Sequence, residues 1–468
     1  MNSMKKVILP VVMSMFLVFT MMPAEAFADD AVVYVTNDGK ELKVDSDPGL
    51  NVQTDPVNNE VTVKDDVPSR SGAKGVIANT SHGGEADVTV EGNVTADSTG
   101  VQAVAWDVNE KKPKTTVRVN GDVTSESSNS YGVEINANGG GEVTVQADNV
   151  TSNGAGMVVS SETGSSAKAE VLDVTGNGMD GLAVLSNGGT IDVLVDGTVT
   201  GKTGGIFVAS GSDVPASNIN VTVWKIEASE GDLIRFDDVS PDKQKEIKQH
   251  IHYIVKLEPS DGADLSATKA DGTQLAQYHD LDTALSGEEV LLKVNLQPGY
   301  KLDGVYNGKG EKVQLIPDKD GNYLVKVTDA GGIYLSVATS KTKHNISYNL
   351  DGGSYNGQIG TITEVYDYGT AIKLLGTPTR EGYRFLYWRG SQYDAGADYT
   401  VEGDHLFTAV WEKISGGSDA NDSHVAKTAA KASPATGDES ELALWISIMA
   451  AAVLALVYTF VRRREYNR

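Results

Sequence analysis

The chain has no cysteine and few aromatic or basic residues. The absence of cysteine among its 468 residues excludes disulfide bridges, thiolate metal sites and a cysteine nucleophile. Aromatic residues make up only 7% of the chain, which argues against a large aromatic-lined pocket. Lys and Arg number 39 against 64 Asp and Glu, giving a formal charge of −25. Such a surface repels the phosphates of nucleic acid, so we expect no nucleic-acid partner.

The sequence also offers no convincing metal site. Its seven histidines never take the spacing of a zinc protease. His250 and His252 would share one face of a strand but not of a helix, and no third ligand lies nearby. The segment Asp318–Gly321 resembles the start of a calcium loop, yet Val327 stands where an EF-hand needs Glu. We therefore predict a hairpin turn there, and no metal or cofactor for the chain.

The middle of the chain is a repeat array. The repeat units of about 25 residues carry two motifs. One of them, Val-x-Val-x-Gly-x-Val-Thr, lies about thirteen residues after the start of most units, as in Val117–Thr124 and Val193–Thr200. The one long interval contains Asn109–Lys114, which we interpret as a loop insertion. Each unit begins with a Gly and an apolar residue, 24 to 32 residues apart, at Gly75, Gly100, Gly132, Gly156, Gly181 and Gly205.

This repeat predicts an all-β solenoid. Short stretches alternate apolar and polar residues and are separated by Gly, Asn and Ser, which indicates strands and tight turns. One unit cannot bury its valine face alone, but stacked units can, because equivalent strands pair about 4.8 Å apart. The region resembles a right-handed parallel β-helix of about seven coils, roughly 30 Å long. A β-sandwich is the alternative, although its strands would not repeat in kind.

Both ends of the solenoid need protection, because an open sheet edge pairs with other chains. We expect residues 31–60 to cap the first coil, within a repeat domain at residues 29–238. Residues 239–252 predict a short helix or connector, with Ser240 as N-cap and Pro241 at the first helical position.

Two smaller β modules follow. Residues 253–341 show alternating segments separated by turns and predict a small antiparallel domain. Residues 344–413 contain the motifs Ile346–Gly353, Pro378–Phe385 and Phe407–Trp411, in that order.

Residues 344–413 resemble the internalin-type B-repeat, also called the Listeria–Bacteroides repeat. Tyr387 departs from that family, which usually has Gly before the Trp. The resemblance implies a small ubiquitin-like β-grasp module of bacterial surface proteins, with Trp388 and Trp411 in its core. It implies a spacer or adhesion role and no catalysis. Residues 414–432 then lose apolar content, which predicts a disordered linker through a cell wall.

The last segment, residues 433–468, combines a short motif with an apolar run. The run Leu442–Val461 would form a transmembrane helix roughly 30 Å long, and Arg462–Arg464 would remain in the cytoplasm. The layout resembles the sorting signal of Gram-positive surface proteins, Leu-Pro-x-Thr-Gly. It implies that a sortase transpeptidase cuts after Thr and links it to peptidoglycan. The motif residues are Ser433 (in place of Leu), Pro434, Ala435, Thr436 and Gly437.

The N-terminus predicts export. Lys5 and Lys6 precede the apolar run Val7–Met22, and small residues then mark a cleavage site between Ala28 and Asp29. A membrane anchor is the alternative, but the run is short. Residues 1–28 are therefore predicted to be a signal peptide. The mature protein is expected to be secreted and anchored to the cell wall, after transient insertion into the membrane through residues 442–461.

We conclude from the sequence that the chain is a non-enzymatic surface protein, an adhesin or binding protein for an unidentified extracellular host protein or glycan. The alternative is an exported polysaccharide lyase or glycoside hydrolase with a β-helix catalytic domain. Three clustered carboxylates beside a Lys or Arg on one face would favour the enzyme. A Thr- and Asn-rich face would favour adhesion. Only three arginines lie between residues 31 and 240: Arg70, Arg118 and Arg235. We interpret Asp192 and Asp196 as acidic residues of turns or of the solenoid rim. No catalytic residue is therefore assigned.

Overall fold

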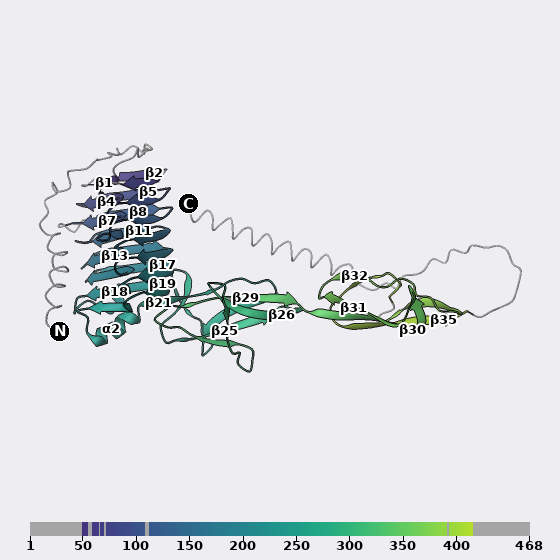
Figure 1. Cartoon of the computed structure of the whole chain (residues 1–468). Coiled ribbons are helices and arrows are strands. Elements are labelled where there is room, and N and C mark those ends of the chain that lie inside the picture. The colour runs from purple at the N-terminus through teal and green to yellow at the C-terminus, as the bar shows by residue number, and fades with distance from the viewer. Residues whose placement is uncertain are drawn as a thin grey trace, which may run out of the picture. The chain divides into compact units, whose positions relative to one another are not determined.

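The computed structural model describes residues 49–54, 59–64, 66–69, 72–107, 112–390 and 393–414. Strands account for most of them, and the repeat array is a parallel β-solenoid (Figure 1). Equivalent strands of successive coils stack in register and form three faces. The first face contains β1 (Leu50–Thr54), β4 (Val76–Ser81), β7 (Val101–Trp106), β10 (Tyr131–Ala137), β13 (Ala155–Glu162), β16 (Leu182–Asn187), β18 (Gly204–Ser210) and β20 (Asp232–Asp237).

The other two faces alternate with the first along the chain. A β-bulge between Val195 and Thr198 bends β17 from the second face into the third. The second face contains β2 (Asn59–Val63), β5 (Glu85–Val90), β8 (Lys114–Val119), β11 (Glu142–Gln146), β14 (Ser166–Val171), β17 (Thr190–Gly201) and β19 (Ile219–Ala228). The third contains β3 (Val67–Ser69), β6 (Val94–Ala96), β9 (Val123–Ser125), β12 (Asn149–Ser152), β15 (Asp173–Gly176) and the ends of β17 and β19.

The core of the solenoid confirms the alternation predicted from the sequence. Val193 and Val195 are fully buried, whereas Leu194 between them faces outward and is half-buried. Valine fills most of the inward positions, and each touches its equivalents in the coils on either side. The period of two therefore decides which residues form the core.

The repeated glycine has a packing role. A Cβ atom on Gly75, Gly100 or Gly132 would lie 2.4 Å from the inward-facing valine of the third-face strand. No real Cβ tolerates such a distance, so the coil can close only where the side chain is missing. The glycine register that identified the solenoid in the sequence is thus a requirement of its core.

The C-terminal end of the solenoid is covered. Helix α2 (Pro241–Lys248) begins as predicted, with the Ser240 hydroxyl accepting a hydrogen bond from the backbone N–H of Lys243 at 3.4 Å. Its one buried residue, Ile247, joins the core. A short 3₁₀-helix (Ala216–Asn218) precedes β19. At the other end β1 lies within the predicted cap at residues 31–60 and β2 begins there, and both pair in parallel as regular rungs.

Strand β21 (Ile251–Leu257) belongs to two sheets. It pairs in parallel with β19 as a further rung, and then in parallel with β29 (Ile333–Lys341). The predicted boundary at residue 253 therefore falls inside a strand. The domain also contains β22 (Ala263–Lys269), β23 (Ala276–Tyr278), β24 (Leu281–Ala284), β25 (Glu289–Leu296), β26 (Tyr300–Asn307), β27 (Lys312–Val313) and β28 (Tyr323–Lys326), whose pairings with one another and with β29 are antiparallel.

The repeat module has one four-stranded sheet, in the order β31-β30-β35-β33, and the pair β32–β34. Its described residues contain no helix, unlike the β-grasp fold expected from the resemblance. Gly376, Pro378 and Gly382 occupy the connection between β32 and β33, and these residues disfavour a helix. The strands are β30 (Lys343–Tyr355), β31 (Gln358–Asp367), β32 (Ala371–Lys373), β33 (Tyr383–Arg389), β34 (Asp398–Thr400) and β35 (His405–Lys413).

Candidate functional site

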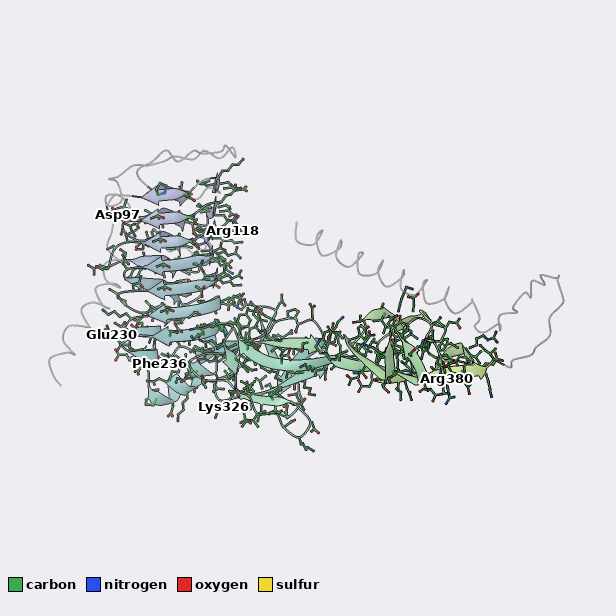
Figure 2. All side chains as sticks on the ribbon, turned by 45° about the vertical axis from the view of Figure 1, so that its right-hand side comes forward. Asp97, Arg118, Glu230, Phe236, Lys326 and Arg380 are labelled. Atoms are coloured by element: carbon green, nitrogen blue, oxygen red, sulfur yellow. The ribbon has the colours of Figure 1, made fainter. Side chains whose placement is uncertain are left out.

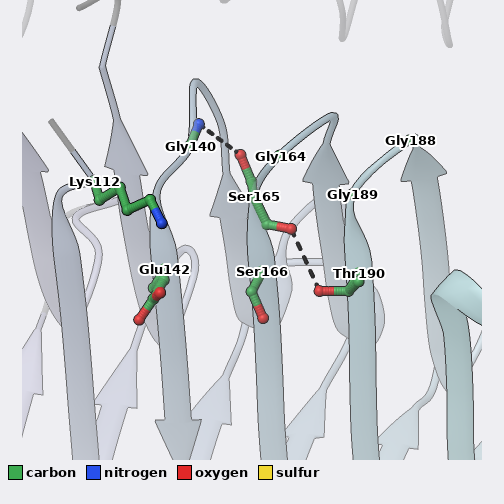
Figure 3. Close-up of a pocket in the computed structure, with 9 residues that line it drawn as sticks. All are labelled: Lys112, Gly140, Glu142, Gly164, Ser165, Ser166, Gly188, Gly189 and Thr190. Atoms are coloured by element: carbon green, nitrogen blue, oxygen red, sulfur yellow. Dashed lines mark hydrogen bonds between the residues drawn. The ribbon is translucent and has the colours of Figure 1, made fainter. Parts of the chain in front are cut away.

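A groove of about 320 Å³ follows the turns between the first and second faces (Figure 3). Three of its glycines, Gly140, Gly164 and Gly188, have positive φ angles of 85°, 79° and 102°. Glycine adopts such angles without strain, which explains the tight turn in each coil. The residues that line the groove are Lys112, Gly140, Glu142, Gly164, Ser165, Ser166, Gly188, Gly189 and Thr190.

Polar groups line this groove in a row. Glu142, Ser166 and Thr190 occupy the same position in successive coils. The hydroxyl of Ser165 accepts a hydrogen bond from the backbone N–H of Gly140 at 3.0 Å, and its carbonyl oxygen accepts one from the Thr190 hydroxyl at 3.4 Å (Figure 3). The groove can therefore offer hydrogen bonds to a polar ligand.

The lining of the groove contains few of the side-chain types that act in hydrolysis. Glu142 is the one carboxylate among its lining residues, whereas glycosidases use a pair. Its hydroxyls have no histidine beside them to act as a base. No cluster of three metal-ligating side chains occurs anywhere in the described residues.

The two arginines of the described solenoid are not brought together. Arg118 pairs with Asp87 on the second face, where it projects outward (Figure 2). Arg235 pairs with Asp180 at 2.5 Å and lies over the Phe207 ring, 4.6 Å from its centroid. Arg118 therefore links adjacent coils, whereas Arg235 links coils that are two rungs apart. Arg70 lies outside the described residues.

The third face carries a ladder of alternating Asp and Asn at its edge. The Asn93 backbone and side-chain amides both donate to the Asp66 carboxylate, at 2.7 and 3.2 Å. One coil further on, the backbone N–H of Asp122 donates to the Asn93 side-chain oxygen at 2.9 Å. Asn149 then donates to Asp122 at 2.8 Å. Sequence reasoning missed this ladder, although an Asx before Val-Thr in four successive units, at Asn93, Asp122, Asn149 and Asp173, was a visible signal.

Beside the ladder, five threonines point outward in register. None of their hydroxyls hydrogen-bonds to another part of the chain within the residues described. Because residues two apart share a face, Asx and Thr form two parallel rows on this third face. The face is therefore Thr- and Asn-rich, and its carboxylates are separated by amides. The threonines are Thr95, Thr124, Thr151, Thr175 and Thr200.

The outer side of the first face is more apolar. Val158 and Ala183 pack there with partly buried Phe207. Nearby, the Glu134 carboxylate accepts hydrogen bonds from Gln102 at 2.8 Å and from other polar neighbours. Trp106 is 43% exposed, the most exposed large hydrophobic residue of the described solenoid after Leu172.

Asp192 and Asp196 both lie on β17 and contact the following domain. Asp192 Oδ1 is 3.0 Å from Nε2 of His279, and Asp196 is 3.9 Å from the Lys256 ammonium. The hydrogen bond to Asp192 raises the pKa of His279. The prediction of rim acids did not anticipate this contact, because the partner lies 87 residues away.

His250 and His252 do not form a ligand pair. His252 lies on β21, is almost fully buried, and stacks on Tyr278 with ring centroids 3.5 Å apart. Burial lowers the pKa of His252 to about 4, and His250 adds to this effect. His250 and His252 thus lie where helix α2 is followed by strand β21.

The Asp318 segment is a turn, as predicted. The Asp318 carboxylate accepts the backbone N–H groups of Asp320 and Asn322, both at 2.8 Å, and Gly321 has a φ angle of 83°. Val327 is buried in the core and is no ligand. In the repeat module Trp388 is fully buried, with its indole N–H donating to the Leu375 carbonyl at 3.1 Å, whereas Trp411 is only half-buried.

Several sequence predictions fall outside the described residues: the signal peptide (1–28), the linker beyond residue 414, and the sorting motif with its apolar run (433–468). Within the described residues, no helix has the length and apolar character needed to cross a membrane.

Comparison with known proteins supports one of the resemblances. Residues 344–410 match the family model of the Listeria–Bacteroides repeat domain. No curated protein matches the chain. The repeat domain and the β-solenoid together fit a surface protein.

Proposed function

We propose that this is a non-enzymatic protein of a Gram-positive cell surface that binds an extracellular ligand through the third face of its solenoid. This proposal rests on the two parallel rows of Asx and Thr side chains on that face. Its five hydroxyls have no partner among the described residues and are available to a ligand. Many weak polar contacts along a solenoid add up, and display of many copies on one surface raises the avidity further.

The second part of the proposal is that the chain is attached to the cell wall. The resemblance of Ser433–Gly437 and the following apolar run to a sorting signal implies attachment of Thr436 to peptidoglycan by a sortase. The match of residues 344–410 to the Listeria–Bacteroides repeat domain supports a surface location, because the resemblance to this family implies a module of bacterial surface proteins. The solenoid would then be the outward part of the chain.

The test is a binding screen with the secreted chain, residues 29–436, on arrays of glycans and extracellular-matrix proteins. A hit is then measured with Thr124→Lys and Thr151→Lys, which should weaken binding by at least tenfold. Trp106→Ala on the first face is the matched control and should bind as the parent does. Loss of binding in the Trp106 variant alone would place the ligand on the first face.

A further inference from the structure

Strand β31 is an unprotected edge of the repeat-module sheet. It pairs with β30 on one side, and no described strand pairs with its other side. Natural edge strands are blunted by short length, Lys or Pro. This one has ten residues, Gln-Ile-Gly-Thr-Ile-Thr-Glu-Val-Tyr-Asp, and contains neither Lys nor Pro. Its backbone is therefore open to strand addition.

The side chains of this edge are unusually apolar for an exposed strand. Ile359 is 80% exposed and Val365 57% exposed. Leu406 of β35, on the same sheet, is 56% exposed. The two acidic residues of the strand have partners inside the module: Glu364 accepts from the Tyr366 hydroxyl at 2.7 Å, and Asp367 pairs with Lys343 at 3.0 Å. The Lys343 ammonium offsets the charge of Asp367, whereas Glu364 keeps its negative charge.

The centre of the strand is symmetric about Ile362. Thr361 and Thr363 lie on its two sides, whereas the next pair outward is Gly360 and Glu364. An antiparallel pair of identical strands places residues at equal distances from the two-fold axis opposite each other. With Ile362 on that axis, Thr361 faces the partner's Thr363. Threonine pairs are favourable cross-strand neighbours.

We propose that β31 pairs with β31 of a second copy of this chain, antiparallel and with Ile362 on the two-fold axis. The two four-stranded sheets then form one continuous sheet, in an isologous interface. Gly360, with a φ angle of 83°, ends the regular register at one side of each copy, so ladder hydrogen bonds are expected over Thr361–Thr363, the part that is symmetric about Ile362. This self-association does not depend on the ligand or on the anchoring proposed above.

The absence of cysteine allows a direct test of the register. Thr361→Cys and Thr363→Cys are prepared as separate secreted chains and oxidised alone or as an equal mixture. The mixture should form disulfide-linked dimers at least fivefold faster than either variant alone, because only unlike positions face each other. Thr175→Cys on the third face is the control and should cross-link no faster than random collision allows. Equal rates in all samples would overturn the proposed pairing.

Sedimentation of the parent chain over a concentration series gives an independent readout. The parent should show a reversible monomer–dimer equilibrium, and Thr363→Lys should shift it towards monomer by at least tenfold. Fluorescence of buried Trp388 checks that the variant is folded. A parent that stays monomeric at every concentration, or a dimer unaffected by Thr363→Lys, contradicts the proposal. Binding of an unrelated strand-forming peptide in place of the second copy also contradicts it.

Discussion

The side-chain oxygen of Asn93 accepts the backbone N–H of Asp122 from the next coil at 2.9 Å. The same Asn93 donates its amide hydrogens to Asp66 in the preceding coil. One residue thus links three coils, as donor in one direction and acceptor in the other. Because equivalent positions lie about 4.8 Å apart, a row of Asp alone would bring carboxylates into direct repulsion. The alternation of Asp and Asn avoids this.

Asn93→Asp should therefore destabilise the solenoid. The change removes the amide donor and inserts a carboxylate between Asp66 and Asp122. We expect a loss of about 1 kcal/mol in the free energy of unfolding at low ionic strength. Denaturant unfolding measures it, and added salt should recover part of the loss because the site is exposed. Thr95→Asp, outside the ladder, is the control; an equal loss there would show that the ladder has no special role.

The inward position of Val195 makes a second prediction. Val195→Asp places a carboxylate in the stacked core without a partner, at a cost of several kcal/mol or a raised pKa of the new group. Leu194→Asp should cost less than about 1 kcal/mol, because that side chain faces outward. Thermal unfolding compares the two variants. Equal losses would be inconsistent with the alternation of the strand.

The burial of His252 predicts that the folded state loses stability in acid. Its folded pKa of about 4 lies below the unfolded value near 6.5, so the unfolded chain binds the extra proton between these values and stability falls as the pH decreases from 6.5 to 4. The full effect is about 3 kcal/mol. His252→Phe keeps the stacking on Tyr278 and should flatten this limb of the stability profile.

The pKa of His279 is shifted in the opposite direction to that of His252, so His279 serves as the control. Its pKa is raised, so its stabilisation is fully present below the unfolded value near 6.5 and is lost as the pH rises through the folded value. His279→Gln should therefore lose more stability at pH 5.5 than at pH 8. Denaturant unfolding across this range measures both variants. Parallel profiles for the parent and both variants would argue against either role.

Thr436→Ala tests wall attachment. If a sortase cleaves between Thr436 and Gly437, the variant should stay in the membrane fraction and be released by detergent, whereas the parent is released by a muralytic enzyme. Ser433→Leu, which restores the motif of the family, should remain wall-linked. Release of Thr436→Ala by the muralytic enzyme alone would rule out this mode of anchoring.

The chain should not degrade polysaccharide. The groove of Figure 3 has a single carboxylate, and the arginines of the described solenoid are in ion pairs with Asp87 and Asp180. Incubation with pectins, glycosaminoglycans and mucin glycans, with and without calcium, should yield neither new reducing ends nor unsaturated products that absorb in the ultraviolet. Either product would support the lyase or hydrolase alternative.

The sequence was sufficient for features that depend on local pattern. Val193–Thr200 predicted both a strand and its inward residues, because alternation and glycine spacing follow directly from stacking. The contact between Asp192 and His279 could not be predicted, since it depends on how a distant hairpin, β23–β24, packs. The connection between β32 and β33 in the repeat module forms no helix, and Gly376 and Pro378 in it disfavour one.

The glycine of each coil also decides how such a protein can change in length. Every coil closes at the same kind of position, so copying a whole unit of about 25 residues would insert one more rung of about 4.8 Å and leave its neighbours' contacts intact. Adding one residue inside a strand would instead turn its valines outward. The long interval from Gly100 to Gly132 shows the tolerated alternative, extra residues between two strands of a coil. Gene duplication can therefore lengthen the molecule in discrete steps without redesign of its interior.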